Sequence, residues 1–328
     1  MFSKARGSVR SRPYPREKRQ DEVAPVAPSA GRILPSAAPS ATRADREEAF
    51  LRALRHRQAT QGRRGLRRRP PKAIPPDSVE REYARALLAM VQAFNDDVRR
   101  ILLDRLPSIG READLARPDR RADDWPQQLQ ELVATLRVRA QQRTAEAEAT
   151  AREYGERTAD WNRAQWRRQI NSVLGVDVLA REPWLTDQLQ SFAAENAALI
   201  RSIPEQQLTQ VEGIAQRGMR SGTRPEEIAH EIGQRFQVAE SRARLIARDQ
   251  VAKLNGQLTE LRQTNIGVTE YIWSTSRDER VRPSHAAKEG KKFRWDDPPA
   301  DTGHPGEDYQ CRCTALPVLD DVIDEFTG

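Results

Sequence analysis

The spacing of hydrophobic and polar positions predicts a chain built mainly from helices. From Asp77 to Pro107, apolar residues recur every three or four positions, which predicts an amphipathic helix. Asp77 and Glu80 have the spacing of a capping box at its start. The apolar stripe consists of Val79, Tyr83, Leu87, Met90, Val91, Phe94, Val98, Ile101 and Leu102.

A second long helix is predicted from Asp124 to about Leu174, after a polar loop. Pro126 stands early in it, where its missing N–H costs nothing. The apolar stripe of this helix is narrow, so the pattern fits an extended arm or an ordinary bundle helix equally well. The stripe includes Leu129, Leu132, Val133, Leu136, Trp161 and Trp166.

Four shorter helices are predicted next. The first spans residues 184–203 and ends before Pro204, and the second spans residues 205–220. The third has Thr223 as its N-cap and Pro225 in its first turn and ends near Phe236, and the fourth spans residues 242–263.

The last two helices, joined by the link 237–241, have two interpretations. Their apolar residues resemble the framework of a helix-turn-helix, and the fourth helix carries a basic face that could read DNA. Two packed helices joined by a short link are, however, a common structural unit with no role in DNA binding. The framework is Ile228, Ala229, Ile232, Val238, Ala243 and Ile246, and the basic face is Arg242, Arg244, Arg248 and Lys253.

Two short strands are predicted near the C-terminus. Residues 268–275 alternate between apolar and polar, and residues 291–295 repeat this pattern. The fold class is therefore mainly α with a small α+β C-terminal domain, long N-terminal helices and a disordered basic N-terminal arm. The predicted parts are a disordered arm (1–76), an elongated helical region (77–204), a C-terminal domain that folds independently (205–320) and a tail (321–328).

Charge is distributed unevenly. The net charge of +7 combines +13 in residues 1–76 with −6 in the rest of the chain. Such an arm is either a site for DNA phosphates, bound without sequence preference, or a solvated tail. The densest basic residues are Arg63, Arg64, Arg67, Arg68 and Arg69.

The chain has no apolar run near the roughly 20 residues that span a bilayer, and its first residues lack the apolar core of a signal peptide. Cys311 and Cys313 stand too close together for an unstrained disulfide. The sequence thus indicates a reduced, cytosolic chain without a membrane partner.

The stretch from Trp273 to Cys313 concentrates the candidate chemistry. His285, His304, Cys311 and Cys313 form a set of two imidazoles and two thiols that suits tetrahedral zinc. Alternatively, the cysteines are small buried hydrophobic residues and the histidines hydrogen-bond turns.

A nuclease-like acid–base cluster is a second possibility in the same stretch. It would consist of Asp278, Glu279, Arg280 and His285. The Asp-Glu-Arg run can equally be a turn held by salt bridges.

A series of motifs follows in fixed order through the last third of the chain: Ile246–Gly256, Thr275–His285, Gly290 with Phe293, Asp297-Pro-Pro299 and His304–Cys313. This ordered series resembles the phage Mu F-like minor head protein family, also called head morphogenesis proteins. The resemblance covers about residues 175–320. Many members have His-Pro-Asn-Cys-Arg-Cys, whereas four extra residues separate His-Pro from the cysteines here.

The resemblance implies a structural minor capsid protein of a tailed bacteriophage or prophage, not an enzyme. It implies action at the portal vertex in head assembly, with portal protein, major capsid or scaffolding protein and non-specific DNA as partners. The protein would reside in the virion head, and in the host cytoplasm during assembly. The rival hypotheses are a phage-encoded nuclease or DNA-modifying enzyme that uses the His285, Cys311 and Cys313 region, and a helix-turn-helix DNA binder.

Overall fold

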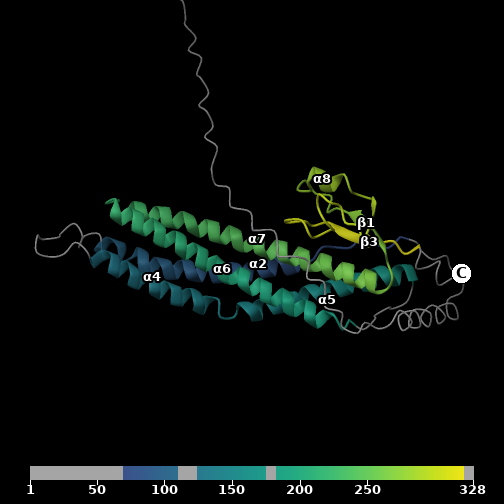
Figure 1. Cartoon of the computed structure of the whole chain (residues 1–328), viewed down its shortest axis with the longest axis horizontal. Coiled ribbons are helices and arrows are strands. Elements are labelled where there is room, and N and C mark those ends of the chain that lie inside the picture. The colour runs from purple at the N-terminus through teal and green to yellow at the C-terminus, as the bar shows by residue number, and fades with distance from the viewer. Residues whose placement is uncertain (1–68, 110–123, 175–181, 321–328) are drawn as a thin grey trace, which may run out of the picture. The chain divides into compact units, whose positions relative to one another are not determined.

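The computed structural model describes residues 69–109, 124–174 and 182–320 (Figure 1). Within these ranges helices dominate, and one small antiparallel sheet lies near the C-terminus. The predicted mainly helical fold class with a small α+β C-terminal part is confirmed. The tail and most of the basic arm lie outside the described residues. None of the helices in the described ranges combines the length and apolarity that a membrane span requires.

Helix α2 (Asp77–Val98) begins at the predicted residue and continues into a π-helical turn, η1 (Arg99–Leu103). Its apolar stripe is buried, and Tyr83 is fully inaccessible to solvent. The predicted capping box is absent because Asp77 is already helical. Glu80 instead pairs with Arg248 of helix α7 (Pro225–Asn265) at 3.0 Å, so this ion pair links the two helices.

The helix predicted from 124 to 174 is two helices, α4 (Asp124–Arg143) and α5 (Ala147–Leu174). At the break, the Thr144 hydroxyl donates to the Ala140 carbonyl at 2.9 Å. The backbone N–H groups of Thr144 and Ala145 bond to carbonyls three residues back, which tightens and ends α4.

Helix α6 (Leu185–Arg220) passes through Pro204, so the predicted helix end before this residue is wrong. A proline inside a helix loses one backbone hydrogen bond and strains the turn before it. Ile200, Ile203 and Leu208 are buried on both sides of Pro204, and their packing offsets that cost. The predicted boundary between residues 204 and 205 therefore falls inside one continuous helix.

Helix α7 (Pro225–Asn265) is also continuous, and the helix-turn-helix hypothesis is wrong. The link 237–241 contains neither glycine nor proline, so nothing in it ends a helix. Ala243 and Ile246 are buried in the core shared with α2, α5 and α6. The basic residues bond within the protein: Arg242 donates to Ser202 and Arg244 pairs with Glu240.

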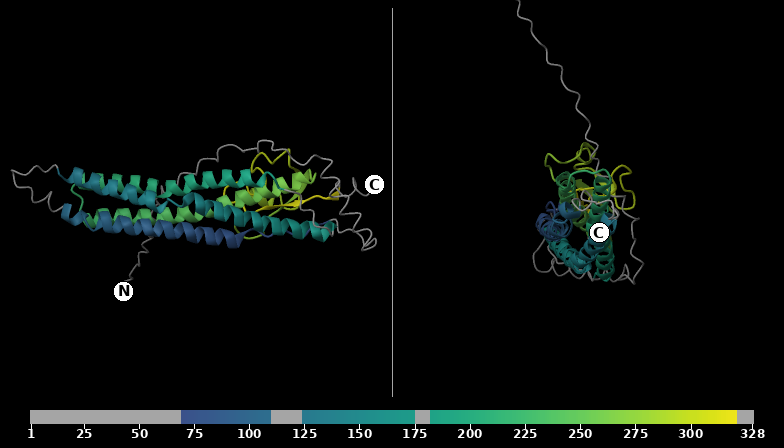
Figure 2. Two further views of the ribbon diagram at one scale, coloured as in Figure 1. Left: turned by 90° about the horizontal axis from the view of Figure 1, so that it is seen from below. Right: turned by 90° about the vertical axis from the view of Figure 1, so that its left-hand side faces the viewer.

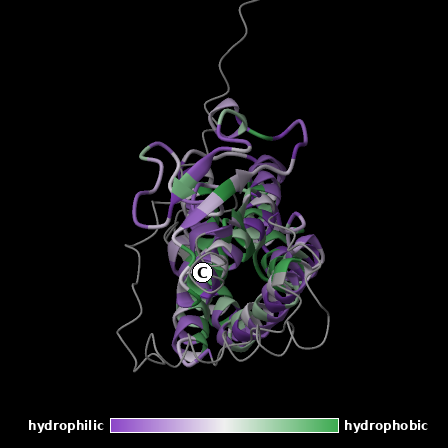
Figure 3. Cartoon of the chain, turned by 90° about the vertical axis from the view of Figure 1, so that its right-hand side faces the viewer, coloured by the Kyte–Doolittle hydropathy of each residue, from purple (hydrophilic) through white to green (hydrophobic). Residues whose placement is uncertain are grey.

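A tight turn makes α6 and α7 antiparallel neighbours. Gly222 has a φ of +68°, a left-handed conformation that residues with a side chain adopt only with strain. The N–H of Thr223 donates to the Gly218 carbonyl at 2.8 Å and closes the turn. A Cβ on Gly218 would lie 2.5 Å from Ile228, so the helices touch closely there. Figure 2 shows the helices running side by side, and Figure 3 shows that each carries both hydrophobic and hydrophilic positions.

The sheet has the strand order β2-β1-β3, with both neighbours antiparallel to β1. Strands β1 (Glu270–Ser274) and β2 (Lys292–Arg294) confirm the two predicted strands. Strand β3 (Thr314–Pro317) has too little alternation to be recognised in the sequence.

The sheet lies beside α7 (Figure 1), and Gln263 of α7 holds it there. The Gln263 side chain donates to the carbonyl of Ala315 at 3.0 Å and accepts from the indole of Trp295 at 3.2 Å. This amide is fully buried, so both bonds anchor the sheet at a defined height along the helix.

Candidate functional site

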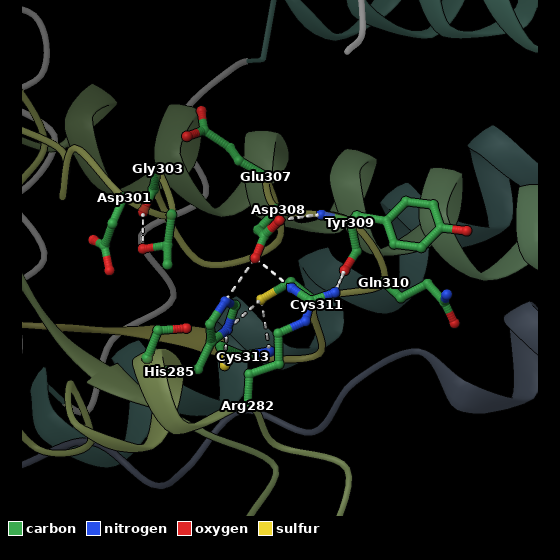
Figure 4. Close-up of polar contacts among 12 residues, drawn as sticks. Arg282, His285, Asp301, Gly303, Glu307, Asp308, Tyr309, Gln310, Cys311 and Cys313 are labelled. Atoms are coloured by element: carbon green, nitrogen blue, oxygen red, sulfur yellow. Dashed lines mark hydrogen bonds and ion pairs between the residues drawn. The ribbon is translucent and has the colours of Figure 1, made fainter. Parts of the chain in front are cut away.

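Three of the four predicted metal ligands converge. The ligand atoms of His285, Cys311 and Cys313 all lie within 4.8 Å of one another. Nδ1 of His285 lies 3.4 Å from the sulfur of Cys313 and 3.5 Å from that of Cys311. All three residues are buried, with exposed fractions of 3%, 3% and 7%. Figure 4 shows the imidazole directed at both sulfurs.

The short helix α8 (Pro283–Ala286) carries His285. Pro283 stands at its first turn, where the fixed φ of proline favours a helix start. The indole of Trp273, in β1, meets the imidazole edge-on with ring centres 5.5 Å apart. The cysteines directly precede β3. Strand β1 therefore positions the histidine through Trp273, and the paired strand β3 positions the cysteines.

The loop before the cysteines lies directly on α7. A Cβ on Gly256 would be 2.5 Å from the carbonyl oxygen of Pro305, and Gly306 has a φ of +97°. Asp249 accepts from the Gln310 N–H at 3.0 Å, and Arg248 donates to the Gln310 side chain at 2.9 Å. The helical motif 246–256 and the cysteine motif therefore belong to one structural unit, because the first supports the loop that carries the second.

Asp308 orients the histidine, and the sequence analysis missed it. Nε2 of His285 lies 2.8 Å from its carboxylate. The carboxylate also accepts from Arg282 and from the Tyr309 N–H, so it is held in place. Asp308 lies within the lengthened segment between His304-Pro305 and Cys311, and this insertion was the available signal.

The surroundings of Cys311 favour its thiolate. Hydrogen bonds from Cys313, from His285 and from the N–H groups of Gly306 and Cys313 lower the pKa of Cys311 to about 5, although burial opposes this shift. The bond to Cys311 raises the pKa of Cys313, and burial adds to the rise. Bonding to Cys311 also raises the pKa of His285, burial opposes this, and Asp308 reinforces it.

His304, the fourth predicted ligand, lies elsewhere in the same domain. Its Nδ1 is 2.9 Å from the hydroxyl of Tyr271, and its ring lies 4.8 Å from that of Trp295. The residue is buried, but the three-residue cluster does not include it. The alternative interpretation, a buried histidine that hydrogen-bonds its surroundings, fits His304.

The predicted acid–base cluster does not form around His285. Asp278 bonds to Arg312 and to the N–H of Arg280, as a turn held by a salt bridge does. Glu279 is exposed. Within the described residues, the group of potential metal ligands around His285 contains neither carboxylate.

A pocket of about 230 Å³ opens beside the three candidate ligand residues, and arginines line its wall. His285, Cys311 and Cys313 border it together with Arg248, Arg280, Arg282 and Arg312. The four arginines meet only in the folded chain, because Arg248 belongs to α7, Arg280 and Arg282 follow β1, and Arg312 lies between the cysteines.

The basic residues predicted to bind DNA are mostly outside the described ranges. This applies to Arg63, Arg64, Arg67 and Arg68, while Arg69 is described and exposed.

Comparison with known proteins finds similarity in one segment of the chain and to one curated relative. A curated protein of Haemophilus influenzae strain Rd, described as an uncharacterized protein, is 40% identical over 181 residues. The match covers 54% of this chain and 40% of that relative, so the chain spans less than half of the relative's length. No solved structure matches. Residues 209–316 match the family described as Phage Mu protein F like protein, which confirms the resemblance inferred from the sequence motifs.

Proposed function

We propose that this protein is a structural minor head protein of a tailed bacteriophage or prophage, and that it acts at the portal vertex during head assembly. The observation that carries the proposal is the match of residues 209–316 to the phage Mu F-like family. That segment begins in α6 and ends in β3, so it includes the docked loop and the His285 cluster.

The proposed partners are portal protein and major capsid or scaffolding protein. The protein resides in the head of the virion, and in the host cytoplasm while heads assemble. Its role is architectural rather than enzymatic. The support for this assignment is the match to the phage Mu F-like family.

Isolation of capsid precursors tests the proposal. In cells that produce the phage or induce the prophage, the full chain should sediment with precursor heads and copurify with portal protein. Heads made without it should fail to mature into DNA-filled particles. A chain that stays out of precursor heads, or purified protein that cleaves plasmid DNA in a metal-dependent reaction, contradicts the structural role.

The basic arm is the proposed DNA contact, because residues 1–76 carry a net charge of +13. Each phosphate contact releases counterions, so affinity should fall steeply as salt rises. Deletion of residues 1–76 should weaken binding and flatten the salt dependence. Equal affinity and equal salt slope for both chains would exclude the arm as the contact.

A further inference from the structure

We propose that His285, Cys311 and Cys313 bind one zinc ion through three protein ligands, and that His304 is not among them. Two thiolates and one imidazole are ligands that zinc prefers. The site lies outside the proposed structural role, which does not require a metal. Its failure would leave the proposed function unaffected.

The distances between ligand atoms fit a tetrahedral ion. With bonds of about 2.3 Å to sulfur and about 2.1 Å to nitrogen, two such ligand atoms lie about 3.6 Å apart. The two nitrogen–sulfur distances here are 3.4 Å and 3.5 Å. Both sulfurs thus lie at nearly the expected distance from the same nitrogen, and all three ligand atoms lie within 4.8 Å of one another, as three ligands of one ion do.

Asp308 leaves the correct histidine nitrogen available. Its carboxylate lies at Nε2, on the side of the ring away from the sulfurs. In the zinc-bound site the metal replaces the Nδ1 proton, and the remaining ring proton, on Nε2, is donated to this carboxylate, so the Nδ1 lone pair faces the sulfurs. Zinc-binding histidines commonly donate their other N–H to a carboxylate, which fixes the ring and strengthens the ligand.

The sulfurs also have partners suited to thiolates. Cys311 accepts from the N–H groups of Gly306 and Cys313, each at 3.4 Å. Backbone donors of this kind stabilise a metal-bound thiolate without competing for the ion. Gly306 has this position because its loop lies against α7 at Gly256, so the helical body pre-arranges the ligand set.

The fourth coordination position faces the pocket of about 230 Å³, which all three ligand residues line. We assign a water molecule to it. Four arginines border the same pocket, so a small anion can approach the ion and displace that water.

Metal analysis of the full chain, purified without a metal-affinity tag, tests the proposal. About one zinc per chain is expected. Cys311→Ser and Cys313→Ser should each lose most of it, whereas His304→Asn should retain it. Asp308→Asn should lower zinc affinity about 10- to 100-fold. Far-UV circular dichroism identifies any variant that has simply unfolded.

Cobalt substitution of the unmodified chain gives a test that needs no variant. A site with two thiolates and one imidazole should give intense sulfur-to-cobalt absorption and tetrahedral ligand-field bands. Azide should shift those bands by displacing the water. A metal-free chain without cobalt absorption overturns the site, loss of zinc in His304→Asn overturns the ligand set, and bands unchanged by azide overturn the open fourth position.

Discussion

Gly256 and Pro305 lie so close that a Cβ on the glycine would come within 2.5 Å of the proline carbonyl oxygen. The contact joins the C-terminal part of the long helix α7 to a loop 49 residues later in the chain. Because the opposing atom belongs to the backbone, a larger residue at 256 must displace the loop that leads to Cys311.

Gly256→Ala should therefore destabilise the protein by about 1–3 kcal/mol, the usual cost of overpacking a filled contact. Gly233→Ala is the matched control, because it lies on the same helix with nothing within 4 Å of an added Cβ. Alanine should stabilise that position by up to about 1 kcal/mol through helix propensity. Thermal unfolding measures both changes, and equal stability of the two variants would contradict the contact.

The sequence predicted the elements that periodicity defines. The stripe from Val79 to Leu102 marked the first helix, and the alternation around Tyr271 marked β1. Where the prediction failed, tertiary packing had overridden a local signal. Pro204 normally ends a helix, yet the buried residues on both sides keep α6 continuous.

The site was predicted only in part, for a related reason. Residue chemistry selected His285, Cys311 and Cys313, because these types are rare in the chain and gathered in one stretch. The same criterion selected His304, which bonds to Tyr271 instead. Asp308 and the four arginines are common residue types, so residue type did not select them for this site. The insertion between Pro305 and Cys311 marks the segment that holds Asp308, and the gathering of the arginines around the pocket is visible only in space.

The shared helical core gives a prediction about fragments. Residues of α2, α5, α6 and α7 form one buried cluster that includes Tyr83, Ile200 and Ile246. A fragment of residues 205–320 lacks α2, α5 and half of α6, so it should lose helix and unfold without a cooperative transition. A fragment of residues 69–320 should unfold cooperatively. Denaturant titration followed by circular dichroism compares the two fragments. Cooperative unfolding of 205–320 would support the independently folding domain predicted from the sequence.

A buried ion pair predicts acid sensitivity. Arg262 is 2% exposed, and its guanidinium donates two hydrogen bonds to the Glu182 carboxylate, at 2.6 Å and 3.0 Å. Burial alone would raise the pKa of Glu182, but the bonds from Arg262 and Arg163 outweigh it and lower the pKa. The stabilisation is complete above the ordinary carboxyl pKa of 4.5, and it declines as the pH falls from there toward the lowered value.

Glu182→Gln should remove this pH dependence and cost about 3–5 kcal/mol at neutral pH, because it leaves the buried guanidinium without a counter-charge. Glu148→Gln is the control, since Glu148 pairs with Arg152 on the exposed surface. Urea unfolding at several pH values measures the difference. Similar stability of both variants at pH 7 would show that the buried pair contributes little.

Trp273 should report on the proposed metal. Its indole meets His285 edge-on, whereas Trp295 contacts His304. Chelation of the metal should therefore change tryptophan fluorescence, and Trp273→Phe should abolish most of that change. Trp295→Phe should leave it in place. A change that survives in Trp273→Phe would place the responding tryptophan elsewhere.

The continuity of α7 sets a distance scale for assembly. At about 1.5 Å per residue, its 41 residues extend over roughly 60 Å. The turn at Gly222 stands at one end of this rod and the sheet lies at the other. Two surfaces at the turn and at the sheet are therefore separated by about the length of this helix, and its rigidity sets their spacing.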